Sequence, residues 1–202
     1  MNNNTTLFSE ETLRSHLESL TSGIRSTINQ FSEKNISDPD FDLTIGQLVS
    51  RNVLNVPILQ EDDTSMKYEE VVVDVMPSYE YPGPSRKVKK MKYTFFTPFK
   101  GSSELFLYRT SEFNFNPPEG KIENGELIYN YLKSPEENIQ NVKQAHSNFL
   151  FSVKWYLERV VREVGPHNNS VGNVINSAVS FRKTEIERQK KMGDELGFKI
   201  RS

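Results

Sequence analysis

The chain has 202 residues, enough for one domain or for one domain with an appendage. Its formal net charge of −2 argues against a protein that coats nucleic acid non-specifically, although it leaves room for a local basic patch. The sequence contains no cysteine, which excludes disulfides, thiolate metal ligands and a cysteine nucleophile.

The sequence carries no signal for secretion or membrane insertion. Its first residues, MNNNTTLFSEE, lack the basic and apolar regions of a secretory signal. No apolar run approaches the roughly 18–20 residues of a membrane span. We therefore expect a soluble cytoplasmic protein with no membrane contact.

The N-terminal part is expected to be a tail followed by a helix. Residues 1–8 are predicted to be disordered, and a helix is predicted over 9–32, with Ser9 as its N-cap and Phe8 packed on Leu13 across the first turn. The apolar residues recur at steps of three and four: Leu13, Leu17, Leu20, Ile24, Ile28 and Phe31. The next apolar stretch, IGQLVSRNVLNVPIL, fits either a helix or a strand.

The middle of the chain, residues 64–132, is predicted to be rich in β-strands. YEEVVVDVM and VKKMKYTFF alternate in polarity, and ELFLYR is a further strand candidate. Asn124-Gly125 predicts a tight hairpin, because both turn positions need a positive φ.

The C-terminal part is predicted to be a helical hairpin over 135–196. Ser134 is a suitable N-cap, Pro135 suits the first helical position, and Glu137 completes a capping box. GPHNNS should break the helix. The whole predicts a single α+β domain over 9–200, with an N-terminal helix, a small, mostly antiparallel sheet and the helical hairpin.

The stretch SRKVKKMKYTFFTPFKG combines basic and aromatic residues, and it has two interpretations. Alternation places Met91, Tyr93 and Phe95 on one strand face, as core side chains. The opposite face would then pair its lysines with Glu70 and Asp74 across a hairpin. Alternatively, the stretch binds nucleic acid through Arg86, Lys87, Lys89, Lys90 and Lys92.

Two further segments are candidates for recognition. FRKTEIERQKK is either a solvated helix with internal ion pairs or a second nucleic-acid contact, made by Arg182, Lys183 and Arg188. SYEYPGPS is either an exposed recognition loop that presents Tyr79 and Tyr81 or a cover over one end of the sheet.

No catalytic motif stands out. His16, His146 and His167 lack metal-ligand spacing; we expect His146 to be a hydrogen-bonded interior or boundary residue and His167 a solvated turn residue. No phosphate-binding glycine motif occurs, so no catalytic residue, cofactor or metal site is predicted. A metal-dependent hydrolase or nuclease that uses Glu70, Asp74 and a lysine such as Lys90 remains an alternative.

The final segment, AVSFRKTEIERQKKMGDELGFKI, resembles segments of uncharacterised bacterial proteins, some of which are found among phage-defence genes. The resemblance covers about the last third of the chain and includes no catalytic motif. It implies a module that works beside an effector or is joined to one.

Together these features favour a non-catalytic interaction or sensing module. The motivation is the pair of predicted amphipathic helices, the charged extension and the missing catalytic pattern. Such a module would form a homo-oligomer or dock a protein partner through its helices. Binding of nucleic acid through residues 86–92 and 182–191 is the alternative.

Overall fold

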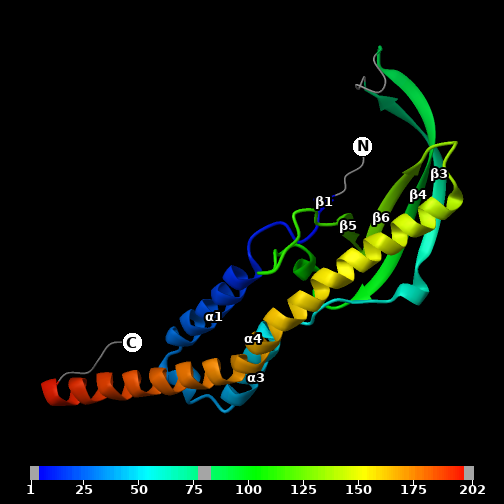
Figure 1. Ribbon diagram of the computed structural model, residues 1–202. Helices are drawn as coiled ribbons and strands as arrows, with labels where there is room; N and C mark the ends of the chain where they lie inside the picture. The colour runs from blue at the N-terminus through cyan, green and yellow to red at the C-terminus, as the bar shows by residue number, and fades with distance from the viewer. Residues whose placement is uncertain (1–4, 77–82, 198–202) are drawn as a thin grey trace. The chain divides into compact units, whose positions relative to one another are not determined.

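The computed structural model describes residues 5–76 and 83–197. The predicted recognition loop with Tyr79 and Tyr81 lies outside the described residues, as do residues 1–4 of the predicted tail. The expected α+β class is confirmed, because helices and an antiparallel sheet occur in separate parts of the chain (Figure 1).

Contacts divide the chain into two compact units. The sheet unit comprises Met1–Glu11 and Val56–Val160, and the helical unit comprises Thr12–Asn55 and Val161–Ser202. One domain can contain two such units, so the single domain expected over 9–200 stays a prediction.

Among its described residues, the sheet unit has six strands. Their order is β1-β5-β6-β4-β2, and β3 pairs with β4 in addition. Asn124 and Gly125 have φ values of 52° and 78°, which confirms the predicted tight turn, here between β5 and β6. The strands are β1 (Thr5–Thr6), β2 (Ile58–Leu59), β3 (Ser65–Val75), β4 (Arg86–Lys100), β5 (Glu119–Glu123) and β6 (Glu126–Lys133).

The segment ELFLYR is not a strand. Its first half lies in a 3₁₀ turn, η2 (Ser103–Phe106), in which Leu105 and Phe106 are fully buried. The Phe106 carbonyl accepts a hydrogen bond from the backbone N–H of Phe8. The segment therefore packs against the N-terminal residues of the chain, which alternation alone could not indicate.

The N-terminal predictions were partly wrong. β1 pairs with β5, and Phe8 is buried with its ring stacked on Tyr156, so residues 5–8 are ordered and Phe8 does not staple a helix. Ser9 donates to the Thr6 carbonyl and cannot act as the cap. The first helix, α1 (Leu13–Asn29), begins later, where the Thr12 hydroxyl accepts from the Ser15 N–H.

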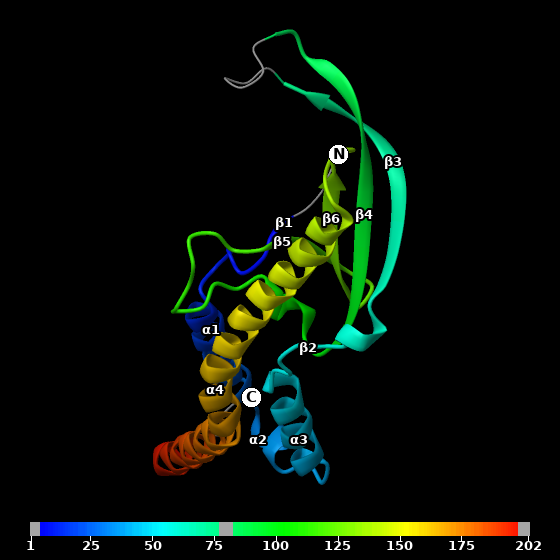
Figure 2. The same ribbon diagram turned by 45° about the vertical axis from the view of Figure 1, so that its right-hand side comes forward.

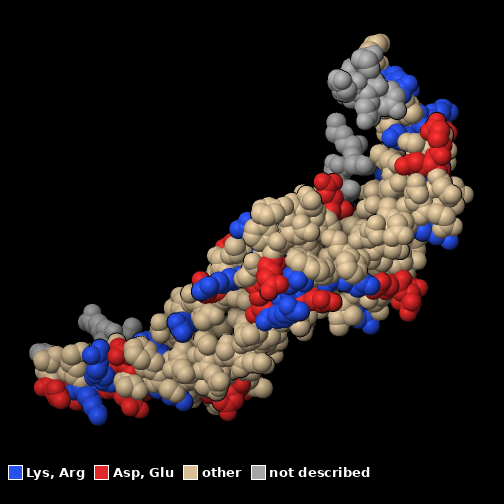
Figure 3. All heavy atoms as spheres, in the orientation of Figure 1, with Lys and Arg blue, Asp and Glu red and all other residues tan. Residues whose placement is uncertain are grey.

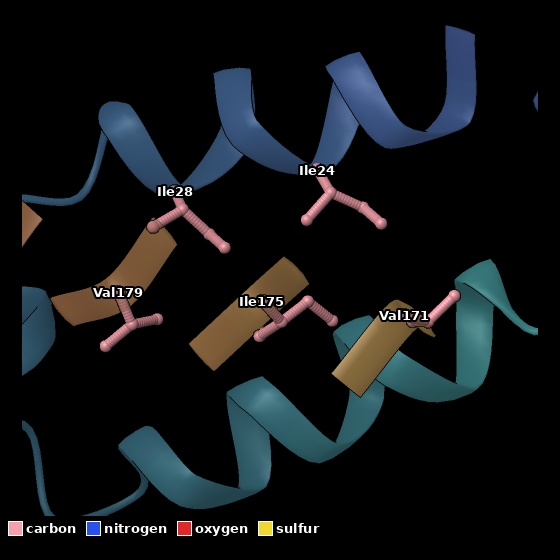
Figure 4. Close-up of a cluster of buried hydrophobic side chains, with 5 residues drawn as sticks. All are labelled: Ile24, Ile28, Val171, Ile175 and Val179. Atoms are coloured by element: carbon pink, nitrogen blue, oxygen red, sulfur yellow. The ribbon is translucent and has the colours of Figure 1, made fainter. Parts of the chain in front are cut away.

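The helical unit has its own core. The ambiguous apolar stretch forms α3 (Phe41–Asn52), and a short helix, α2 (Glu33–Ile36), precedes it. Figure 4 shows side chains from α1 and from the C-terminal helix α4 (Ile139–Leu196) facing one another. The buried cluster consists of Ile24, Ile28, Val171, Ile175 and Val179.

The predicted helical hairpin was wrong, because α4 is one helix of 58 residues with Pro166 inside it (Figure 1). Proline fits helical φ and removes one backbone hydrogen bond. Tertiary contacts hold the following turn: His167 is only 8% exposed, and its Nε2 lies 3.0 Å from the Asn52 carbonyl. His167 is thus not a solvated turn residue.

A second contact of the same turn joins side chain and backbone. The Asn168 side chain accepts from the Leu54 N–H at 2.9 Å and donates to the Leu54 carbonyl at 2.8 Å.

The start of α4 also differs from the prediction: the Glu137 carboxylate accepts from the Ser134 N–H, but the helix begins only at Ile139.

Candidate interaction site

The alternation predicted for β4 is confirmed only in part: Phe95 packs against other rings, but Met91 and Tyr93 are only half-buried, and Thr94 on the opposite face is 4% exposed. The first half of α4 lies against the sheet (Figure 2), and Phe95 stacks on His146 with ring centroids 4.1 Å apart. On the same face Phe95 and Tyr129 are cross-strand neighbours. Because Phe95 packs within the sheet unit, its ring face towards His146 is occupied.

The lysines of β4 contact acids of β3, and the predicted acid Glu70 is one of them, but its partner Lys89 lies on the aromatic face rather than on the opposite face. Lys89 donates to Glu70 at 2.8 Å, and Lys92 lies 3.5 Å from Glu69. The register puts Glu70 opposite Met91 and puts Val71 opposite Lys90, so Glu70 lies on the aromatic face. The contact with Glu70 raises the pKa of Lys89 through a hydrogen bond and charge attraction.

The rest of the hairpin carries mixed charge. Asp74 lies opposite Lys87 in the register, and Arg86 lies opposite Val75 at the end of the ladder. In Figure 3, acidic and basic side chains lie next to one another on the hairpin at the upper right. Neighbouring acids offset part of the positive potential that phosphates would require.

The second basic stretch also engages its own unit. Arg182 Nε donates to the Phe31 carbonyl at 2.8 Å, and the Lys183 ammonium lies 5.5 Å from the centre of the Phe41 ring. Arg188 lies 3.3 Å from Glu185 on the same helix. The two basic stretches belong to different units. Nucleic-acid binding therefore stays a prediction, which salt-dependent retention on DNA or RNA would test.

The acid–acid–lysine arrangement is not assembled on one face. Glu70 and Asp74 share a face of β3, whereas Lys90 lies on the opposite face of β4. Among residues 5–76 and 83–197, no group of three or more histidines and acids is placed to hold a metal ion.

His146 is a half-buried boundary residue whose Nε2 lacks the expected hydrogen bond. That atom is buried and has no partner in the described part of the chain. Burial lowers the pKa of His146, and the charge of Glu61 opposes this shift more weakly. The imidazole therefore acts mainly as a flat ring that fills space against Phe95.

A loop between η2 and β5, which the sequence patterns did not single out, carries two exposed phenylalanines. Phe113 is 43% exposed and Phe115 is 89% exposed. Their rings meet edge to face with centroids 5.5 Å apart. We call this segment, residues 111–116, the two-phenylalanine loop. Its signal in the sequence is SEFNFN, in which aromatic residues alternate with polar ones just before two prolines.

A buried tyrosine holds this loop in place. The Tyr156 hydroxyl accepts a hydrogen bond from the Asn114 N–H and donates one to the Asn114 carbonyl, both at 2.9 Å. The Tyr156 ring is fully buried and stacks on Phe8 at 4.7 Å. Because Asn114 lies between the two phenylalanines, this contact fixes the backbone from which both rings project.

Charged groups line the base of the loop. The Arg109 guanidinium lies 5.2 Å from the centre of the Phe113 ring. Glu112 lies 3.3 Å from Arg159, whose guanidinium covers Trp155. The loop thus has an apolar tip and a polar base, the layout of a small interaction surface.

The helical unit carries a second exposed apolar region. An open groove of about 460 Å³ between α1 and α4 is lined by residues that include Arg25, Asn29 and Phe181. Farther along α4, Met192 and Leu196 are exposed. Docking through the helices therefore stays a prediction with a surface on which it can be tested.

Comparison with protein-family models, curated proteins and solved structures found no match to this chain. Within the described residues, no helix combines the length and the apolar character that crossing a bilayer requires. Inference about function therefore rests on the geometry of the chain itself.

Proposed function

We propose that this chain is a non-catalytic protein-interaction module whose two-phenylalanine loop inserts into an apolar pocket of a partner protein. The observation that supports the proposal is the double hydrogen bond from Tyr156 to Asn114, which holds the loop while Phe115 remains 89% exposed. Exposed apolar groups on a fixed backbone are typical of a binding surface.

The energetics of association favour such a loop. Burying one phenylalanine side chain contributes about 1.5–3 kcal/mol. Binding also costs free energy when a mobile loop must be ordered, and a loop that is already held avoids much of that cost. Aromatic residues at the centre of an interface commonly account for a large part of the binding energy.

The chemistry of the loop indicates the kind of partner. Phe113 and Phe115 form an exposed apolar tip, which an apolar pocket of a partner would bury. Arg109 and Glu112 at its base can meet polar groups around the rim of that pocket. The resemblance of residues 178–200 to proteins found among phage-defence genes suggests an effector as this partner.

The test compares two variants of the purified full chain. The Phe113→Ser/Phe115→Ser variant should lose a defined partner that the wild type retains from extracts of the source organism. Phe151→Ser is the matched control, because Phe151 is an exposed phenylalanine on α4 and should be dispensable. A photo-reactive phenylalanine at position 115 should cross-link to that same protein.

The outcomes distinguish specific binding by the loop from non-specific hydrophobic binding. Equal retention by the wild type and both variants would contradict the proposal, and so would cross-linking from position 151 but not from position 115. Circular dichroism on each variant establishes that the fold is intact before binding is compared.

A further inference from the structure

β3 is a long edge strand. It has eleven residues and, within residues 5–76 and 83–197, pairs only with β4. Figure 2 shows it as the outer strand of the hairpin. An edge strand presents N–H and C=O groups on which another strand can form a ladder. Residues 65–70 are all exposed, so their side chains leave room for a further strand beside β3.

A row of tyrosines crosses the sheet and ends at this edge. Tyr131 of β6 is opposite Tyr93 of β4, and Tyr93 is opposite Tyr68 of β3. The Tyr68 and Tyr93 ring centroids are 6.2 Å apart, and Tyr68 is 67% exposed. The row therefore ends at Tyr68, which among the described strands has a cross-strand neighbour only on the β4 side.

We infer that β3 pairs antiparallel with β3 of a second copy of this chain, with Tyr68 on the two-fold axis. This surface is separate from the two-phenylalanine loop. Tyr68 of one copy then faces Tyr68 of the other, and the row of three tyrosines becomes a row of six. Aromatic cross-strand pairs are among the contacts that stabilise sheets.

The charges on β3 favour this register, because among axes through residues 65–75 the one at Tyr68 is the one that sets Lys67 opposite an acid. With Tyr68 on the axis, Lys67 of each copy faces Glu69 of the other, which makes two attractive pairs. An axis at Glu69 or Glu70 would set two carboxylates opposite each other, and an axis at Val72 would set Glu70 opposite Asp74. An axis between two residues is excluded, because it would set side chains from opposite faces of the sheet against each other.

The existing ion pair extends the same pattern. Glu69 already lies 3.5 Å from Lys92 of β4. Lys67 of the second copy would approach Glu69 from the other side, so one carboxylate would lie between two ammonium groups. Charged side chains on an edge normally discourage pairing with unrelated strands. Here they permit a copy of the same strand, because its charge order is self-complementary.

Cysteine cross-linking tests the axis directly, since the chain has no native cysteine. Residues that face each other in an antiparallel pair have Cα atoms about 4.5–5.5 Å apart, within the range for a disulfide. Under mild oxidation with copper phenanthroline, the Tyr68→Cys variant should form a covalent dimer. The matched Glu70→Cys and Val72→Cys variants lie on the same face and should form about tenfold less. Efficient cross-linking at position 70 or 72, or none at position 68, would overturn the inference.

A mixing experiment keeps Tyr68 intact and tests the charges. Lys67→Glu and Glu69→Lys should each weaken the homodimer about tenfold, because each sets like charges opposite. Mixed one to one, the two variants should form a heterodimer of near wild-type affinity, measured by sedimentation. Wild type that stays monomeric at high concentration, or variants whose mixture is no tighter than each alone, would refute the pairing.

The two proposals fail separately. The Phe113→Ser/Phe115→Ser variant should retain the Tyr68-centred dimer, and the Lys67→Glu variant should retain the partner bound by the loop. Loss of the dimer in the phenylalanine variant would assign self-association to the loop and contradict the strand pairing.

Discussion

Replacement of Tyr156 by phenylalanine tests the structural basis of the two-phenylalanine loop. The change removes one oxygen and leaves the ring, which can stay stacked on Phe8 at 4.7 Å. The lost hydroxyl both accepts from the Asn114 N–H and donates to the Asn114 carbonyl. The variant therefore deletes two hydrogen bonds and creates almost no cavity.

The expected magnitude follows from these two bonds. A hydrogen bond within a protein contributes about 0.5–1.5 kcal/mol net, so their loss should lower the free energy of unfolding by about 1–3 kcal/mol. A loop released in this way must be ordered again on binding. If that ordering costs about 1.4 kcal/mol, the partner dissociation constant rises about tenfold.

Three measurements check this prediction. Urea unfolding gives the stability change, hydrogen exchange at the Asn114 amide reports on the loop, and binding to the captured partner gives the change in affinity. Tyr131→Phe is the matched control, because its hydroxyl makes one longer bond, 3.3 Å, to Glu137. Tyr156→Phe with wild-type stability and unchanged exchange at Asn114 would refute the reasoning.

Three other changes test the fold. Burial lowers the pKa of His146 below its ordinary value of 6.5. As the pH falls from 7.5 to 5.5, the unfolded chain therefore binds more protons than the folded chain, and the wild type should lose stability over this interval. The His146→Leu variant should lose less over the same interval in urea unfolding; an identical loss would exclude this histidine as the source. Pro166→Ala should raise the melting temperature, since a continuous α4 gains a backbone hydrogen bond, whereas a lower value would indicate a turn at this position. Asn168→Ala should cost about 1–3 kcal/mol in denaturant unfolding, because it deletes both contacts with the Leu54 backbone, and a change below about 0.5 kcal/mol would contradict their role.

The sequence by itself determined the features that depend on neighbouring residues. Asn124-Gly125 specifies a tight turn, because few other pairs adopt positive φ twice in succession. Alternation on β4 placed Phe95 and Lys92 on opposite faces. The three- and four-residue spacing of apolar positions in α1 placed Ile24 and Ile28 in a core.

The tertiary structure decided what depends on distant partners. α4 continues through Pro166 where Asn168 binds the backbone of Leu54, 114 residues away. The two-phenylalanine loop is held by Tyr156, 42 residues beyond Asn114. Strand register is also a long-range property, and an error of one residue exchanges the faces, as happened for Glu70. Helix propensities differ by up to about 1 kcal/mol for most residues and by about 3 kcal/mol for proline. Several tertiary hydrogen bonds, each contributing about 0.5–1.5 kcal/mol, are therefore needed to hold a helix through Pro166.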